Sequence, residues 1–128
     1  MSLTLNLKTY TYRQNTAGVS TYINSASNTV NGFSSLTATT TIGKPALGNR
    51  PASRSKTMWK LSLPVLAEDD SACGCTGEVI GTCDWLVEVR SDVRVPTSVL
   101  ADGRLRMKDL IATSEFIASV DSHTQPTA

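Results

Sequence analysis

Two long stretches of alternating apolar and polar residues dominate the pattern of the chain. Along residues 56–66 the odd positions are mostly apolar, with Trp59 and Leu61 among them, and the even positions from 56 to 62 are mostly polar. Along residues 84–95 the odd positions carry Trp85 and valines, whereas the even positions are mostly charged. A period of two predicts a β-strand with one buried face. We therefore expect these two strands to organise the fold.

Three further strands follow from the same alternation. Residues 3–13 predict a first strand, residues 14–18 supply turn-forming Asn and Gly, and residues 19–24 return, which makes a hairpin of residues 1–24. Residues 33–42 alternate again, and their even positions are mostly apolar. The other face of this strand bears hydroxyl groups, from Thr37, Thr39 and Thr41.

Two loops interrupt the main sheet, which is expected over residues 33–95. Residues 43–56 are punctuated by Pro and Gly and lack any acid, so they suit phosphate contact, although a solvated connection is equally compatible. Residues 67–83 are rich in Gly and acid, hold every cysteine, and are too long for a tight turn. Long loops in compact domains are usually functional.

The end of the chain predicts two helices over residues 97–121, followed by a polar tail of residues 122–128. Pro96 ends the last strand because it cannot donate to a ladder. Ser98 or Asp102 is the expected cap of the first helix, which runs to about Thr113, and a glycine at position 103 favours the later start. Ser114 is the expected cap of the second helix.

These elements predict one α+β domain of residues 1–128: an N-terminal β-hairpin, an antiparallel meander sheet and two C-terminal helices. Two short helices cannot cover the apolar face of five strands, and such a face needs cover. A second copy supplies that cover most simply. We therefore expect a homodimer in which each chain's helices cover the partner's sheet and leave the Thr and Lys face open.

The net charge of +1 hides a strong asymmetry along the chain. Residues 1–66 contain seven basic residues and no acid, whereas residues 67–128 contain all eleven acids and five basic residues. The two halves therefore carry +7 and −6. This asymmetry indicates a basic face for a polyanion and an acidic face turned elsewhere, although chance in a Thr-rich region gives the same pattern.

Composition and motifs exclude other classes of function. No apolar run reaches membrane-spanning length, and the first residues lack the basic and apolar blocks of a signal peptide, so we expect a cytoplasmic protein with no membrane partner. No Gly-x-Ser-x-Gly elbow, phosphate-binding glycine loop or His-Glu-x-x-His motif is present, and the only histidine, His123, lies in the tail. We expect no enzyme activity and no cofactor.

In length and order of features, nearly the whole chain resembles the coat proteins of the small single-stranded RNA bacteriophages. The resemblance is carried by the hairpin start, the strand from Leu36 to Ile42, the basic loop, the strand ending at Pro64, the Cys-Gly-Cys loop, the strand closed by Pro96, and the terminal helices. It implies interlocked dimers that assemble into an icosahedral shell, with the sheet facing the genome. Many members also bind an RNA hairpin and repress translation of the replicase. The implied location is the virion, assembled in a bacterial cytoplasm.

The resemblance also implies which residues face RNA. Basic side chains there would neutralise phosphate, and hydroxyls would hydrogen-bond to phosphate or base edges. Each position is equally compatible with an ordinary solvent-facing side chain. With the end of the basic loop included, the candidates are Thr37, Thr39, Thr41, Arg54, Lys56, Met58, Lys60, Ser62, Glu88, Arg90 and Asp92.

One departure from the family concerns the last strand. Several members use an aromatic residue there to stack on an unpaired base, whereas the polar positions of this strand carry none; they are Leu86, Glu88, Arg90, Asp92 and Arg94. The departure favours general RNA packaging over recognition of a particular hairpin.

The three cysteines are compatible with several chemical states. In the family the corresponding loop surrounds the five-fold and quasi-six-fold openings of the shell, where some members crosslink neighbouring subunits by disulfides. Cys73 and Cys75 are too close in sequence to pair without strain. Either Cys83 pairs with one of them, or the cysteines join different subunits. Zinc binding and free thiols are also compatible with the sequence.

Two further classes of protein fit part of the sequence. A small dimeric β-sheet RNA-binding module without a shell would explain the charge asymmetry alone. A disulfide-bearing adhesion or pilus-like domain would explain the threonines and cysteines but lacks a secretion signal.

Overall fold

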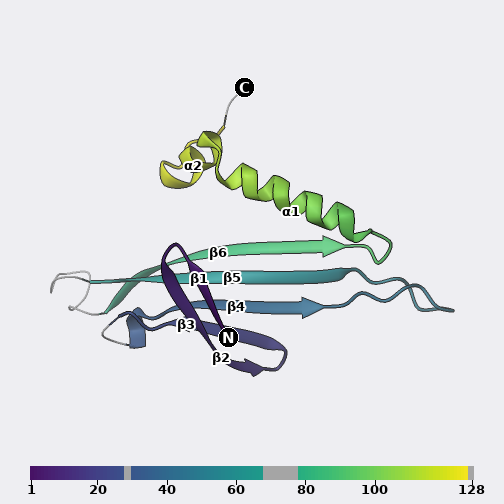
Figure 1. Ribbon diagram of the computed structural model, residues 1–128, viewed down its shortest axis with the longest axis horizontal. Coiled ribbons are helices and arrows are strands. Elements are labelled where there is room, and N and C mark those ends of the chain that lie inside the picture. The colour runs from purple at the N-terminus through teal and green to yellow at the C-terminus, as the bar shows by residue number, and fades with distance from the viewer. Residues whose placement is uncertain (28–29, 68–77, 127–128) are drawn as a thin grey trace. The chain divides into compact units, whose positions relative to one another are not determined.

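The computed structural model describes residues 1–27, 30–67 and 78–126 of the chain. The chain divides into two compact units, Met1–Val93 with all the strands and Arg94–Ala128 with both helices (Figure 1). Each unit is described in turn.

The first unit is a six-stranded antiparallel sheet in which the strands follow one another in sequence order. A short 3-10 helix, η1 (Val30–Gly32), precedes the fourth strand. The strands are β1 (Ser2–Leu5), β2 (Lys8–Thr16), β3 (Val19–Asn24), β4 (Ser34–Thr41), β5 (Ser55–Leu66) and β6 (Val79–Ser91). The predicted meander followed by two helices is confirmed, and β1 and β6 are its edges.

The first predicted strand, residues 3–13, is wrong because the chain reverses inside it. Asn6 and Leu7 have φ values of 46° and 63° and form a two-residue turn, across which Leu5 pairs with Lys8. A turn with both central residues at positive φ matches the twist of the flanking strands. The alternation continues unbroken through this turn, so the pattern alone does not reveal it. Positive φ is uncommon for a residue such as leucine.

The last strand also differs from its predicted bounds of residues 84–95, because β6 begins at Val79 and ends at Ser91. The Ala67 amide donates to the Glu78 carbonyl at 2.8 Å, so backbone pairing continues beyond β5. The expected loop of residues 67–83 is therefore shorter, and Cys83 lies within β6 opposite Leu63. Pairing with β5 outweighs the loop-like composition of this segment.

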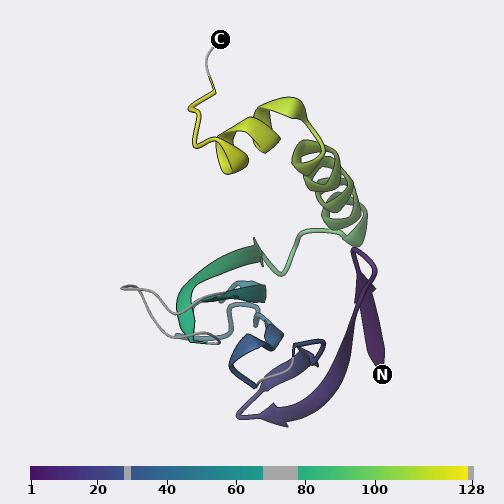
Figure 2. The ribbon, with the colours of Figure 1, turned by 90° about the vertical axis from the view of Figure 1, so that its left-hand side faces the viewer.

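The core of the sheet unit is formed by residues of β2, β3 and β4. Tyr10, Tyr22 and Leu36 are 2%, 8% and 6% exposed, and Leu3, Trp59 and Leu61 pack against them. The hydroxyls of Tyr10 and Ser34 are hydrogen-bonded at 2.9 Å. Figure 2 shows β1 and β2 turned out of the plane of the other strands. The pairing of β2 with β3 is irregular between Tyr12 and Gln14, and such a bulge bends a strand and increases its twist.

Much apolar surface of the sheet lies outside this core. Trp85, Val87 and Val89 on β6 are 37%, 52% and 48% exposed. Apart from the core residues Tyr10, Tyr22 and Leu36, Ala67 is the only buried hydrophobic residue in the part of the chain that the structure describes. Large exposed apolar patches are typical of interaction sites.

The second unit contains α1 (Thr97–Ile111) and α2 (Ser114–Asp121). The prediction that Ser98 or Asp102 caps α1 is wrong, since Pro96 occupies the N-cap position and α1 continues through Gly103. Good helix formers around the glycine outweigh its cost of about 1 kcal/mol.

The cap of α2 differs from the prediction by one residue. The Thr113 side chain accepts a hydrogen bond from the Phe116 amide at 3.3 Å, so Thr113 rather than Ser114 is the cap. Neither helix contains a buried residue. Large apolar side chains are exposed on both helices, at Val99, Leu100, Leu105, Met107, Leu110, Ile111 and Ile117. Within the described residues, neither helix has the length and apolar character needed to cross a membrane.

Candidate nucleic-acid interface

The pairings of β4, β5 and β6 place hydroxyl and charged residues in rows on one side of the sheet. Residues directly opposite each other on antiparallel strands project to the same face. The face defined here, called the polar face, consists of the rows Ser35–Ser62–Asp84, Thr37–Lys60–Leu86, Thr39–Met58–Glu88 and Thr41–Lys56–Arg90.

Nine of the eleven predicted RNA-facing residues lie in these rows. They are Thr37, Thr39, Thr41, Lys56, Met58, Lys60, Ser62, Glu88 and Arg90. The other two lie beyond the paired strands, since Arg54 directly precedes β5 and Asp92 directly follows β6. The register thus brings together side chains from three strands that are distant in sequence.

The opposite side of the same strands is apolar and is called the apolar face. Its rows are Leu36–Leu61–Trp85, Ala38–Trp59–Val87 and Thr40–Thr57–Val89. Period-two alternation on three adjacent strands therefore separates the sheet into a polar and an apolar face.

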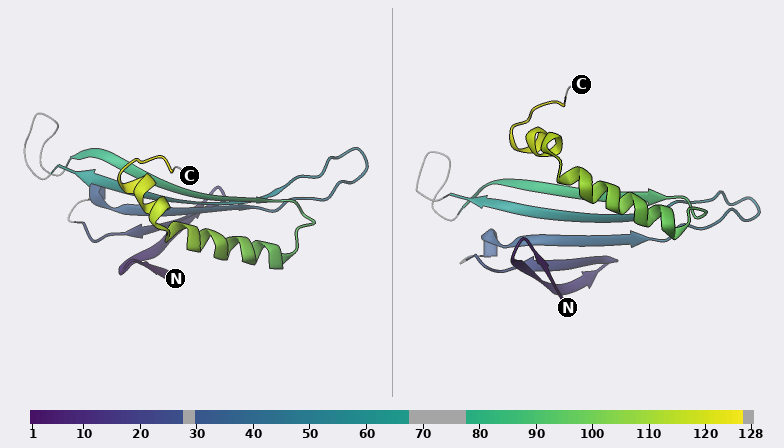
Figure 3. Two further views of the ribbon diagram at one scale, coloured as in Figure 1. Left: turned by 90° about the horizontal axis from the view of Figure 1, so that it is seen from above. Right: turned by 45° about the horizontal axis from the view of Figure 1, so that its top comes forward.

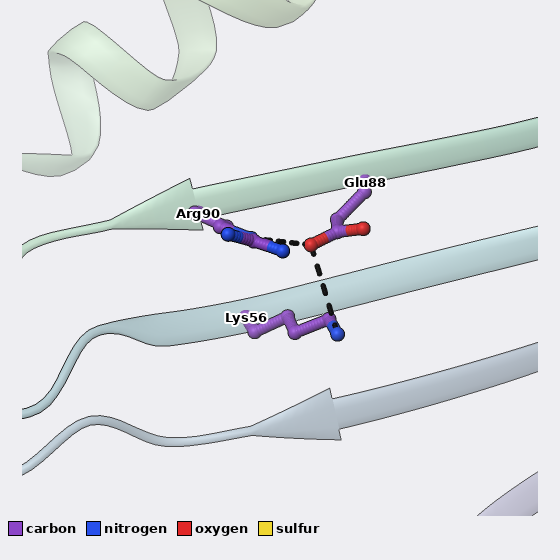
Figure 4. A network of polar contacts seen from close by, with 3 residues as sticks. All are labelled: Lys56, Glu88 and Arg90. Atoms are coloured by element: carbon purple, nitrogen blue, oxygen red, sulfur yellow. Dashed lines mark hydrogen bonds and ion pairs between the residues drawn. The ribbon is translucent and has the colours of Figure 1, made fainter.

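Glu88 is the centre of the charge network on the polar face (Figure 4). The Arg90 guanidinium donates to its carboxylate, and the Lys56 ammonium nitrogen Nζ lies 3.6 Å from the same oxygen, Oε1. The hydrogen bond from Arg90 lowers the pKa of the Glu88 carboxyl, and the positive charges of Arg90 and Lys56 act in the same direction. One carboxylate therefore fixes the position of two cations.

Asp84 plays a similar part and was not among the predicted residues. Its Oδ1 accepts a hydrogen bond from the Ser62 hydroxyl at 2.7 Å, and its Oδ2 lies 3.7 Å from Lys60 Nζ. The sequence could have indicated Asp84, because residue 84 has an even number, like Glu88 and Arg90, and therefore lies on the same side of the strand. With Asp84 included, every cation in the four rows faces a carboxylate, so an anionic ligand must compete with these carboxylates for the cations.

Of the three cysteines, only Cys83 lies within the described residues. Cys73 and Cys75 lie outside the described residues, whereas Cys83 is exposed on β6 and forms no disulfide with any described residue. Among the described residues no three His, Cys, Asp or Glu side chains come together as a metal site. The crosslinking of the cysteines stays a prediction.

The arrangement of strands and helices is the fold of bacteriophage coat proteins. The chain is similar in fold to the virus-like particle of bacteriophage ESE058, with a TM-score of 0.76 and 15% identity over 99% of this chain and 95% of that one. The virus-like particle of Beihai levi-like virus 21 gives 0.76 and 13% over 100% and 96%. The bacteriophage GA capsid protein gives 0.68 and 16% over 94% and 88%.

The resemblance inferred from the sequence is thus confirmed at the level of the fold. No family model matches the chain, and no curated protein sequence does so either.

The Glu88 network predicts a pH-dependent contribution to stability. Because the folded-state pKa of Glu88 lies below its ordinary value of 4.5, the stabilisation is present above that value and is lost as the pH falls through the folded-state pKa. Glu88→Gln should therefore lower the melting temperature at pH 7, and this gap between the variant and wild type should close as the pH falls below 4.5.

Thermal unfolding at fixed protein concentration measures this gap. Asp109→Asn on α1 removes the same charge away from the network and is the matched control. A gap for Glu88→Gln that stayed constant into strong acid would mean that the substitution acts through packing rather than charge.

Proposed function

We propose that this chain is a structural, non-enzymatic capsid protein that self-assembles as dimers into an icosahedral shell around single-stranded RNA. The observation that carries the proposal is the coat-protein fold, matched over at least 94% of the chain in the three comparisons described above. The corresponding location is the virion, with assembly in the cytoplasm of a bacterial host.

Dimer formation is supported by the apolar face and by the free edge of the sheet. β6 is an edge strand of 13 residues, and a long edge with unpaired backbone groups is a template for pairing with another chain. In the proposed interlocked dimer the two β6 strands pair, and the helices of each copy lie across the apolar face of the other. The exposed apolar residues of α1 and of β6 are then buried together.

RNA packaging is supported by the chemistry of the polar face. Its lysines and arginine suit phosphate, and its Thr and Ser hydroxyls suit phosphate, sugar or base edges. No aromatic residue occupies the four rows, so stacking on an unpaired base has no platform there. We therefore infer packaging without strong sequence preference rather than repression through one RNA hairpin.

The cysteines add a proposal about the finished shell. We infer that Cys73, Cys75 and Cys83 form disulfides between neighbouring subunits after release into an oxidising medium. The exposed thiol of Cys83 is accessible for such a reaction.

The first prediction from the proposed function concerns assembly and RNA content. The chain expressed alone in bacteria should elute from a sizing column as a megadalton peak with nucleic-acid absorbance. Lys60→Ala combined with Arg90→Ala should lower the ratio of absorbance at 260 nm to that at 280 nm, because two phosphate-binding charges are lost. The matched control is Arg104→Ala with Lys108→Ala, which removes the same charge from α1.

A dimer-sized peak without nucleic acid would contradict the shell and favour the small binding module. An equal loss of RNA in both double variants would remove Lys60 and Arg90 from the site.

The second prediction tests the apolar face with two adjacent residues. Val87 and Leu86 are 52% and 58% exposed, but they lie on the apolar and polar faces respectively. Val87→Lys should abolish dimers and particles, since it would bury an unpaired charge in the dimer interface. Leu86→Lys should leave them intact. Light scattering at matched concentration measures both variants, and equal behaviour of the two would contradict the proposed interface.

The third prediction concerns the crosslinks. Oxidised wild-type particles, run on a denaturing gel without reductant, should give dimers or larger species, and the variant with all three cysteines changed to Ser should give monomers. Particles of that variant should assemble normally and lose heat resistance. A wild-type protein that ran as a monomer after oxidation would show that its thiols do not join subunits.

A further inference from the structure

The connection between β4 and β5, residues 42–54 and here called the arm, continues past the ends of both strands (Figure 3). At its base the Gly43 amide donates to the Ser55 hydroxyl at 2.8 Å, and the Lys44 amide donates to the Ser53 hydroxyl at 2.9 Å. The Ser53 amide returns a hydrogen bond to the Lys44 carbonyl at 2.9 Å. The two sides of the arm are therefore tied together.

The tip of the arm is also held by hydrogen bonds. Leu47 and Arg50 exchange backbone hydrogen bonds of 3.1 and 2.9 Å around a turn in which Gly48 has a φ of 57°. The Arg50 guanidinium donates to the Pro45 carbonyl at 3.3 Å.

At the base of the arm, the close approach of its two sides requires a glycine at position 43, since a Cβ added to Gly43 would lie 2.5 Å from the Ser53 carbonyl oxygen. A fixed arm loses less conformational entropy when it binds a ligand.

The charge of the arm differs from that of the polar face. Lys44, Arg50 and Arg54 are exposed, the arm contains no acid, and residues 1–66 contain none either. Within the described residues none of these three cations forms an ion pair, whereas Lys56, Lys60 and Arg90 on the polar face all do. The arm thus carries +3 that no described carboxylate compensates.

We propose that the arm is a second RNA-binding element, with Lys44, Arg50 and Arg54 contacting backbone phosphates. This inference rests on the proposed packaging of RNA. Phosphate contacts of this kind fix and hold a strand without reading its sequence. The arm has no aromatic residue to stack on a base, so its contribution is electrostatic and falls with salt.

Polyanionic RNA fits the arm better than a protein surface does. Ile42 and Leu47 are its only large apolar residues, and one lies next to β4 while the other lies at the turn. Two separated apolar side chains do not form the contiguous patch typical of protein interfaces. Three exposed cations within 13 residues, with no acid among them, match a chain of phosphates.

The test is the salt dependence of RNA binding. Full-length protein is freed of RNA, its size is checked on a column, and it is titrated into a short labelled oligouridylate at several salt concentrations. Lys44→Gln with Arg50→Gln should weaken binding and reduce the slope of log affinity against log salt by about 1.4, since each phosphate contact on a single strand contributes about 0.7. The exchange Lys44→Arg with Arg50→Lys keeps both charges and should keep the slope.

The matched control is Lys8→Gln with Arg13→Gln. These residues are exposed on β2, belong to the same acid-free half of the chain, and form no ion pair within the described residues. This control should bind like wild type. Equal slopes for the arm variant and wild type would overturn the role of the arm while leaving RNA packaging standing, as would an equal reduction in the control.

Two further results would also overturn the inference. If wild-type protein failed to bind the oligouridylate at low salt, the proposed function and the role of the arm would fall together. If the arm variant stopped assembling while its dimers kept the wild-type slope, the arm would be a contact between copies of the chain.

Discussion

The structure depends on the separation of three adjacent strands into an apolar and a polar face. Because side chains alternate along each strand, the register that places Trp59 beside Val87 also places Lys60 beside Thr37. A slip of one residue would bury the charges and expose the apolar rows. The same constraint leaves few residues of the described chain buried, and Trp85, Val87 and Val89 of the apolar face stay exposed. Self-association is thus the expected consequence of the sheet itself.

The cations of the polar face and those of the arm differ in whether a described carboxylate lies beside them. On the polar face, Glu88 and Asp84 hold their cations in place, which limits the cost of like-charge repulsion but lowers the attraction for an added anion. On the arm, no described carboxylate offsets the charge. We infer that the arm attracts RNA independently of its sequence, whereas the polar face supplies directional hydrogen bonds from fixed positions. Such a division would let RNA dock on the arm before it displaces carboxylates from the polar face.

The sequence predicted the strand order and the composition of both faces because period-two alternation depends only on local residue types. It failed where conformation depends on single dihedral angles or on distant pairing. The turn at Asn6 and Leu7 interrupts no alternation, so one strand was expected where two exist. The start of β6 at Val79 depends on its pairing with β5, which local composition does not encode. Asp84 could have been found from its even position, but its contact with Lys60 required the register.

The packing of the fold restricts the choice of residues on the apolar face more than on the polar face. Coat-protein structures sharing 13–16% identity with this chain preserve the fold, because an alternating pattern tolerates many apolar and polar substitutions that keep the faces distinct. The residues on the polar face are under no such packing constraint, since they project away from the apolar face. Their identity can therefore change while the sheet stays the same. It follows that the fold alone does not define what the polar face binds, and any ligand preference must be argued from this chain's own Thr, Lys, Arg and Glu side chains.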